Sequence, residues 1–296
     1  MIARVASAQS HPADTLAAAV RRAGSPVCVG LDPVIDRLPA TMRGLSAADA
    51  LERFCCGVID AVAPLAAAVK FQSACFERHG PAAIAALARC CAHARRAGLV
   101  TVLDAKRGDI GISAAHYAAA AAEHFDADWT TASPYLGTEG FMPFAGPGRG
   151  VFVLVRTSNP SGDSVQSIPL AGGGTLSDAI ARQVADAGAA SLGESGYSSV
   201  GAVVGATKSA EARRLRALMP RQWFLIPGYG AQGGTADDIR SSVDEHGLGA
   251  LVTASRSVIF PTNPDDSHWP DSVAAAADRM SRELRSALSD AGECRQ

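Results

Sequence analysis

The chain has 296 residues, of which 48% are hydrophobic and 19% are charged, and its formal net charge is -2. This composition is typical of a folded globular protein and gives no electrostatic reason to expect nucleic acid or a membrane as a partner. The seven cysteines are odd in number and show no C-x-x-C spacing, which favours reduced thiols in a cytoplasmic protein.

Helical and strand patterns alternate along the chain. An amphipathic helix is expected at 12–23, ended by Gly24-Ser25-Pro26, and no early apolar segment indicates secretion or membrane insertion. Further helices are expected from the cap at Ser46 to Pro64, at 81–97, 112–124, near Thr138, and at 209–219 and 272–288. Apolar runs predict strands at 27–31, 66–71, 99–103, 128–132, 150–156, 200–205, 223–226 and 250–253.

Eight strand-helix units in one chain predict a fold of the α/β class, a single (β/α)8 TIM barrel over residues 1–296. Residues 1–24 would form an N-terminal helical extension, either a plug of the barrel or an interface element. A doubly wound open sheet is the alternative, but no G-x-G-x-x-G follows the first strand. The segment 157–174, rich in Ser, Gly and Pro, is expected to be a long loop at the end of the fifth strand, where a barrel places its active site.

Charged residues stand where the predicted strands end. They are Asp32 after the first strand, Lys70 at the second, Asp104 and Lys106 at the third, Arg156 at the fifth and Arg256 after the eighth. Because these ends converge on one mouth of a barrel, the pattern predicts a catalytic site. The glycine-rich turn 227–235 exposes backbone N–H groups beside Arg256, which indicates a small phosphorylated substrate.

Six segments, spread in the expected order over nearly the whole chain, resemble the orotidine 5'-phosphate decarboxylase family, specifically its longer bacterial type. The most specific is Leu103-Asp104-Ala105-Lys106-Arg107-Gly108-Asp109-Ile110-Gly111, which carries a D-x-K-x-x-D motif. The others are Val29-Gly30-Leu31-Asp32-Pro33, Val69-Lys70-Phe71-Gln72, Ser133-Pro134-Tyr135, Thr157-Ser158-Asn159-Pro160 and Pro227-Gly228-Tyr229-Gly230-Ala231-Gln232-Gly233-Gly234.

The resemblance implies decarboxylation of orotidine 5'-phosphate to UMP, with Lys106 protonating C6 of the pyrimidine. Asp104 would lie near the substrate carboxylate, and Lys70 and Asp109 would complete a row of alternating charges that fixes Lys106. Asp32 and Lys70 would also hold the ribose hydroxyls. No cofactor and no metal are implied.

The resemblance further implies a homodimer in which Asp109 and Ile110 reach the neighbouring subunit's site. Ser158 would contact the pyrimidine edge. Gln232, Gly233 and Arg256 would bind the 5'-phosphate. Ser113 stands where many relatives have threonine, and only that hydroxyl contact is in question. Arg156 has no assigned role beyond that of a structural ion-pair partner.

Three alternatives share part of this pattern. A sugar-phosphate decarboxylase or epimerase would use the same Asp104, Lys106 and Asp109 with a metal-stabilised enediolate. A Schiff-base aldolase would need a neutral lysine, which carboxylate neighbours disfavour. A phosphate-binding barrel without catalysis would need Arg256 and the turn, but no Asp-Lys-Asp row.

Overall fold

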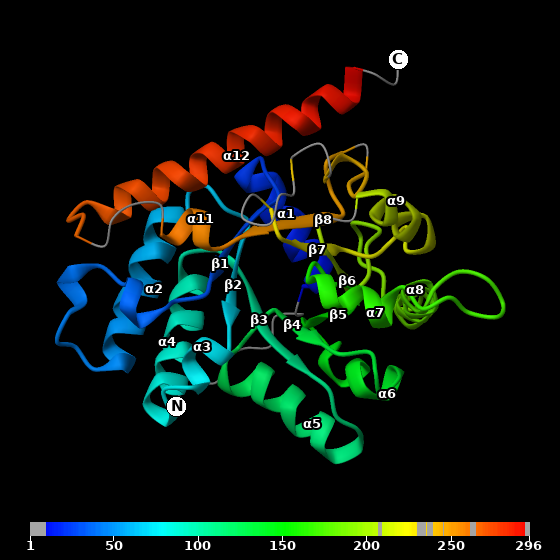
Figure 1. Cartoon of the computed structure of the whole chain (residues 1–296), viewed down its shortest axis with the longest axis horizontal. Helices are drawn as coiled ribbons and strands as arrows, with labels where there is room; N and C mark the ends of the chain where they lie inside the picture. Colours follow the sequence, from blue (N-terminus) through cyan, green and yellow to red (C-terminus); the bar gives the residue numbers. More distant parts are fainter. Residues whose placement is uncertain are drawn as a thin grey trace.

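The computed structural model describes residues 10–206, 209–229, 235, 239–244, 246–260 and 265–293. Within these ranges, eight parallel strands close into a barrel in which each strand pairs with the next and β8 pairs with β1 (Figure 1). The predicted (β/α)8 barrel is therefore confirmed. The strands are β1 Val27–Leu31, β2 Ala68–Gln72, β3 Val100–Arg107, β4 Trp129–Ala132, β5 Gly150–Arg156, β6 Val200–Val204, β7 Phe224–Pro227 and β8 Ala250–Ala254.

Helices surround the barrel, as Figure 1 shows. The longer ones are α1 Pro12–Ala23, α2 Ala47–Val62, α4 Pro81–Arg96, α5 Gly111–Ala119, α8 Leu176–Gly188, α9 Ser209–Leu218 and α12 Trp269–Glu293. The shorter ones are α3 Ala74–Glu77, α6 Thr138–Phe141, α7 Asp163–Gln166 and α11 Arg256–Ile259, with 3-10 turns at Ile35–Arg37, Ala40–Met42, Met142–Phe144 and Pro160–Gly162 and a π turn at Ala120–His124.

Local signals in the sequence set several helix ends. The Ser46 hydroxyl accepts the N–H of Asp49 at 3.2 Å and caps α2, as expected. Thr175 and Asp178 form a reciprocal capping box at the start of α8. Gly24 ends α1 with a φ of 64°, a conformation that glycine adopts at little cost. None of the helices in the described ranges has the length and apolar content to cross a membrane.

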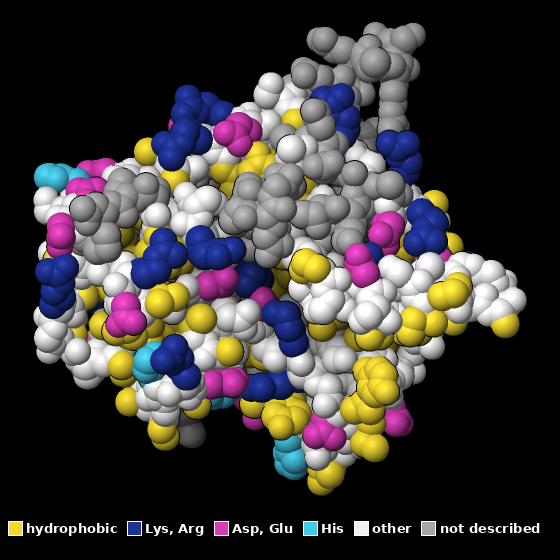
Figure 2. All heavy atoms as spheres, in the orientation of Figure 1, with side chains coloured by type: hydrophobic (Ala, Val, Ile, Leu, Met, Phe, Trp, Pro, Cys, Tyr) yellow, Lys and Arg dark blue, Asp and Glu magenta, His cyan; other side chains and the backbone are white. Residues whose placement is uncertain are grey.

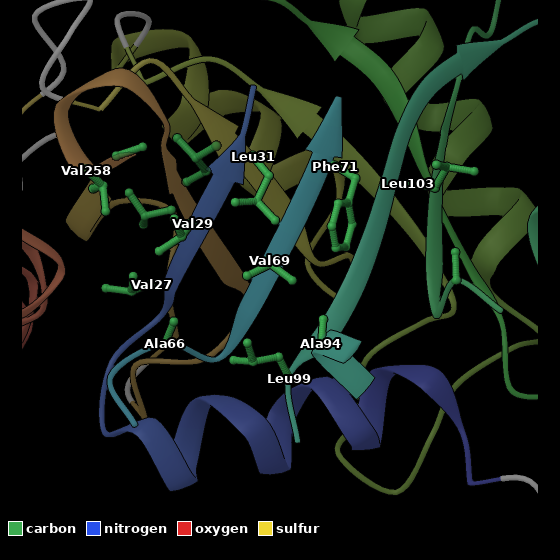
Figure 3. Close-up of a cluster of buried hydrophobic side chains, with 14 of the residues drawn as sticks. Val27, Val29, Leu31, Ala66, Val69, Phe71, Ala94, Leu99, Leu103 and Val258 are labelled. Carbon is green, nitrogen blue, oxygen red and sulfur yellow. The ribbon is translucent and has the colours of Figure 1, made fainter. Parts of the chain in front are cut away.

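Two layers of apolar packing hold the barrel. The outer layer joins strands to helices, and Figure 3 shows part of it around Val27, Val29 and Val69. The inner layer fills the half of the barrel nearer the N-terminal ends of the strands, where the rings of Trp129 and Phe152 stack with centroids 4.4 Å apart. Helix α1 contributes to this inner layer and runs beneath the starts of the strands in Figure 3. It thus covers the N-terminal end of the barrel, the first of the two roles considered for it.

Three elements differ from the sequence-based prediction. Strand β3 continues to Arg107, past the charged residues, with a shift of register against β4. The expected helix 112–124 changes to π geometry at Ala120. The segment 157–174 is not a plain loop, because it carries a 3-10 turn, helix α7 and a bridge between Pro169 and Thr175.

Candidate active site

A cavity of about 420 Å³ opens at the C-terminal ends of the strands. In Figure 2, Lys, Arg, Asp and Glu side chains meet in a hollow near the centre of the visible face. Six residues predicted from the sequence line this cavity: Asp32, Lys70, Asp104, Lys106, Ser158 and Arg256. Strands β1, β2, β3, β5 and β8 carry them or end just before them, so the barrel brings together groups spread over more than 200 positions of the chain.

Four of these residues form a row of alternating charges. The Lys70 ammonium lies 2.8 Å from one carboxylate oxygen of Asp104 and 3.4 Å from the carboxylate of Asp32. The Lys106 ammonium donates to the other oxygen of Asp104 at 2.6 Å. Asp104 therefore lies between two cations, and the order of the row is Asp32, Lys70, Asp104 and Lys106.

The two lysines of the row differ in exposure. The side chain of Lys70 is 6% exposed and that of Lys106 is 46% exposed. Burial alone would lower the pKa of Lys70, but the charges of Asp104 and Asp32 outweigh it and raise that pKa above its ordinary value. Burial opposes the charged form of Asp104 as well, but Lys70 and Lys106 hold its pKa well below the usual range. Both groups are thus charged at neutral pH, and Lys106 is the most exposed member of the row.

Two neutral side chains complete the surroundings of Asp104, and the sequence analysis missed both. The Thr131 hydroxyl donates to Asp104 at 2.9 Å, and the Gln72 amide donates to it at 3.4 Å. Each lies near the C-terminal end of a strand, with its side chain turned to the cavity. Strand alternation places Gln72 on the same face as Lys70, a signal that could have identified it.

The predicted residues Asp109, Ile110 and Ser113 are not among those that line the cavity. The Asp109 carboxylate accepts the backbone N–H of Ile110 at 2.8 Å, in the turn between β3 and α5. Its backbone oxygen packs against Gly140 in α6. Within a single chain, Asp109 therefore does not extend the charge row, which was one of the roles expected for it. Gln232 and Gly233 lie outside the described residues.

Arg156 is 1% exposed and holds the segment that follows β5. Its guanidinium pairs with Asp163 of α7 at 2.7 Å and with Glu211 of α9 at 2.5 Å. Gln166 accepts from Arg156 at 3.1 Å and from the backbone N–H of Thr157 at 2.9 Å. The predicted structural ion-pair role is confirmed, and the ordered helix α7 in the expected loop is explained by these contacts.

Glycines allow two close approaches beside the cavity. A Cβ on Gly205 would lie 2.9 Å from the backbone of Ser158, so the end of β6 leaves room for the segment that carries this serine. A Cβ on Gly30 would lie 2.0 Å from the hydroxyl oxygen of Ser255, the residue just before Arg256. A larger residue in place of Gly205 would displace the backbone of Ser158, and one in place of Gly30 would displace the side chain of Ser255.

The side of the cavity at β7 and β8 carries Arg256 and the first residues of the glycine-rich turn. Gly228 has a φ of 97°, which favours glycine there. Tyr229 lines the cavity, and its hydroxyl donates to Glu283 of α12 at 2.7 Å. Burial, together with this carboxylate, raises the pKa of Tyr229 above its ordinary value. The hydrogen bond ties the beginning of the turn to the C-terminal helix.

Comparison with known proteins gives one consistent result. Residues 25–267 match the family model described as orotidine 5'-phosphate decarboxylase / HUMPS family. The chain is 41% identical to the orotidine 5'-phosphate decarboxylase of Rhodopirellula baltica, over 92% of this chain and 98% of that protein. It is 40% identical to that of Paracidovorax citrulli, over 94% and 98%. The solved structure of Leishmania donovani OMP decarboxylase superposes with a TM-score of 0.77 at 32% identity, covering 94% of this chain and 99% of that one.

Proposed function

Because this chain belongs to the orotidine 5'-phosphate decarboxylase / HUMPS family, we propose that it converts orotidine 5'-phosphate to UMP and carbon dioxide, the last step of de novo pyrimidine nucleotide synthesis. The observation that carries this proposal is the row Asp32, Lys70, Asp104 and Lys106 on the wall of a cavity that also holds Arg256.

Lys106 is the proton donor in this proposal. Loss of carbon dioxide breaks the bond from C6 to the carboxylate carbon and leaves the electron pair on C6, in a ring that offers no electron sink. The Lys106 ammonium stabilises this developing charge and then transfers a proton to C6, which leaves a neutral amine that solvent reprotonates. Its 46% exposure and its bond to Asp104 support this role, because the ammonium is both held and accessible.

Asp104 favours decarboxylation by repulsion. Its carboxylate would face the substrate carboxylate, and the repulsion between them disappears as carbon dioxide departs. At about 4 Å and an effective dielectric of about 20, two such charges repel by roughly 4 kcal/mol. Enzymes lower barriers by about 8–23 kcal/mol, so repulsion is a partial contribution and Lys106 must supply more.

The remaining residues bind the substrate. Asp32 and Lys70 hold the ribose hydroxyls, Ser158 bonds the pyrimidine edge, and Arg256 binds the 5'-phosphate with Gln232 and the backbone of Gly233. Ser113 is proposed for a hydroxyl contact, and because it does not line the cavity of one chain, that contact needs a rearrangement or a second subunit.

A homodimer is part of the proposal. Ile110, Ile112, Tyr135 and Leu136 form an exposed apolar rim beside Asp109, and Ile112 and Tyr135 are 76% and 87% exposed. Figure 2 shows hydrophobic side chains gathered on the lower right, over the region of α5 and α6. An exposed apolar patch is typical of a protein interface. Burying this rim against a second copy would carry Asp109 and Ile110 to the neighbouring cavity.

We further propose a cytoplasmic location. The six cysteines that the structure describes are all free thiols, which is the usual state in that compartment.

Turnover of orotidine 5'-phosphate by the purified protein tests the function. We expect the orotate-type absorbance to fall, UMP to appear, and Lys106→Met to be inactive. The rate should be the same with and without EDTA, whereas an enzyme that works through a metal-bound enediolate would lose activity. Absence of turnover at ordinary enzyme concentrations would contradict the proposal.

A further inference from the structure

Lys106 has an uncommon backbone conformation. Its φ is 47°, in the left-handed region that a residue with a long side chain rarely adopts. Among the non-glycine residues that the structure describes, only Asp126 shares a positive φ. Such a conformation persists where neighbouring groups enforce it, and it concentrates at functional sites.

The cause lies in the pairing of β3 with β4. Leu103 pairs with Thr130 and Arg107 pairs with Ala132, so four steps along β3 correspond to two steps along β4. Two extra residues of β3 are therefore accommodated between these pairs, and the strand bulges there. The bulge aims the Lys106 side chain back at Asp104, which lies two residues earlier in the same strand.

Thr131 occupies the position opposite this bulge. Its hydroxyl oxygen accepts the backbone N–H of Lys106 at 2.9 Å, and its hydroxyl proton is donated to Asp104 at 2.9 Å. The direction of both bonds is fixed, because an N–H only donates and an ionised carboxylate only accepts. One oxygen of Asp104 thus accepts hydrogen bonds from both the Thr131 hydroxyl and the Lys106 ammonium. Lys106 is therefore held at two points, by Thr131 at its backbone N–H and by Asp104 at its ammonium.

We propose that Thr131 is a positioning residue for the decarboxylation. Its hydroxyl holds the backbone of Lys106 in the left-handed conformation and orients Asp104, so that the ammonium stays directed into the cavity. The residue is 1% exposed although it borders the cavity, so its hydroxyl is engaged by these two partners. This inference rests on the proposed function, since it assigns Thr131 a role through Lys106.

Thr131→Val, Thr131→Ser and the wild type are compared by kcat and KM for orotidine 5'-phosphate. Valine keeps the shape but lacks both hydrogen bonds, and the loss of a buried partner predicts a kcat lower by about 10- to 100-fold with little change in KM. Serine keeps the hydroxyl, and we expect it to restore most of kcat. Affinity for UMP should be equal in all three, because the cavity keeps its lining.

Thr130→Val is the matched control. Thr130 is the preceding residue of β4, is 4% exposed, and faces away from the cavity by strand alternation. Its substitution removes a buried hydroxyl of the same kind and should leave kcat unchanged. If Thr131→Val fails to fold, the same comparison is made between Thr131→Ser and Thr131→Ala.

Wild-type kcat in Thr131→Val would overturn the inference while leaving the proposed function intact. An equal loss in the serine and valine variants would also overturn it, because the hydroxyl would then not be the cause. An inactive wild type would overturn the proposed function and, with it, this role for Thr131. A fall in kcat for valine alone, with unchanged UMP affinity, supports the inference.

Discussion

Lys70 and Lys106 bond the same carboxylate, yet their removal should reduce the stability of the protein to very different extents. Lys70→Met is expected to destabilise the protein strongly, because the Asp104 side chain is 8% exposed, keeps its charge and is left with only the half-exposed Lys106 as a cation. At 2.8 Å and an effective dielectric of about 20, the attraction lost is about 6 kcal/mol. Part of this is offset because the ammonium is no longer buried and Lys106 still pairs with Asp104, which leaves a net cost within the range of about 3–5 kcal/mol for a broken buried pair.

Lys106→Met should cost only about 0–1 kcal/mol, because its ammonium is 46% exposed and Asp104 keeps Lys70 as partner. Catalysis should nevertheless be abolished, since the proposed proton donor is gone. In the stability measurement, each lysine variant thus serves as the control for the other. The pair separates a residue that stabilises the site from one that performs the reaction.

Denaturant unfolding measures the two stabilities, and thermal unfolding gives a second reading. At about 2–4 °C per kcal/mol, Lys70→Met should melt roughly 6–20 °C below the wild type. The double variant Lys70→Met/Asp104→Leu should recover part of this loss, because the buried carboxylate is removed together with its buried cation. Equal destabilisation by the two single variants, or a loss below about 1 kcal/mol in Lys70→Met, would refute the reasoning.

Two further predictions concern pH and the subunit boundary. Because the pKa of Asp104 lies below its ordinary value of 3.8, its stabilising contribution is complete above that value and is lost as pH falls from there through the lowered pKa of the folded state. The melting temperature of Asp104→Asn should therefore fall less than that of the wild type between about pH 5 and pH 2, and equal slopes would contradict the assignment. The raised pKa of Lys70 affects stability at alkaline pH. The stabilising contribution of Lys70 is complete below its ordinary pKa of 10.5 and is lost only at higher pH. Inactive Lys106→Ala and Asp109→Ala proteins should regain up to about one quarter of wild-type activity when their subunits exchange, since half of the dimers then carry one intact site. Confirmed exchange without recovered activity would remove Asp109 from the neighbouring site.

The sequence predicted the strands and the position of the charge row because both depend on local patterns. Apolar runs identify buried strands, and the parallel barrel rule brings Asp32, Lys70 and Asp104 to one mouth regardless of their separation. The order of the row could therefore be inferred before any distance was known.

The role of Thr131 and the ion-pair partners of Arg156 could not be inferred in the same way. The bond from Thr131 to Lys106 depends on a register shift between β3 and β4, and nothing in either strand's own pattern encodes that shift. Arg156 was expected to form an ion pair, but its partners Asp163 and Glu211 lie on separate helices. The packing of those helices is a tertiary property that composition does not contain.

The buried guanidinium of Arg156 also determines which part of the chain can move near the cavity. The stretch from Thr157 to Gln166 is joined through it to α9, so this stretch cannot swing away alone without separating the Asp163 carboxylate from a cation that is 1% exposed. Such a movement also breaks the bond from Arg156 to Gln166, and a hydrogen bond to a charged group contributes about 1.5–3 kcal/mol, several times the thermal energy. Ser158 therefore belongs to a rigid body that includes part of the outer helical layer.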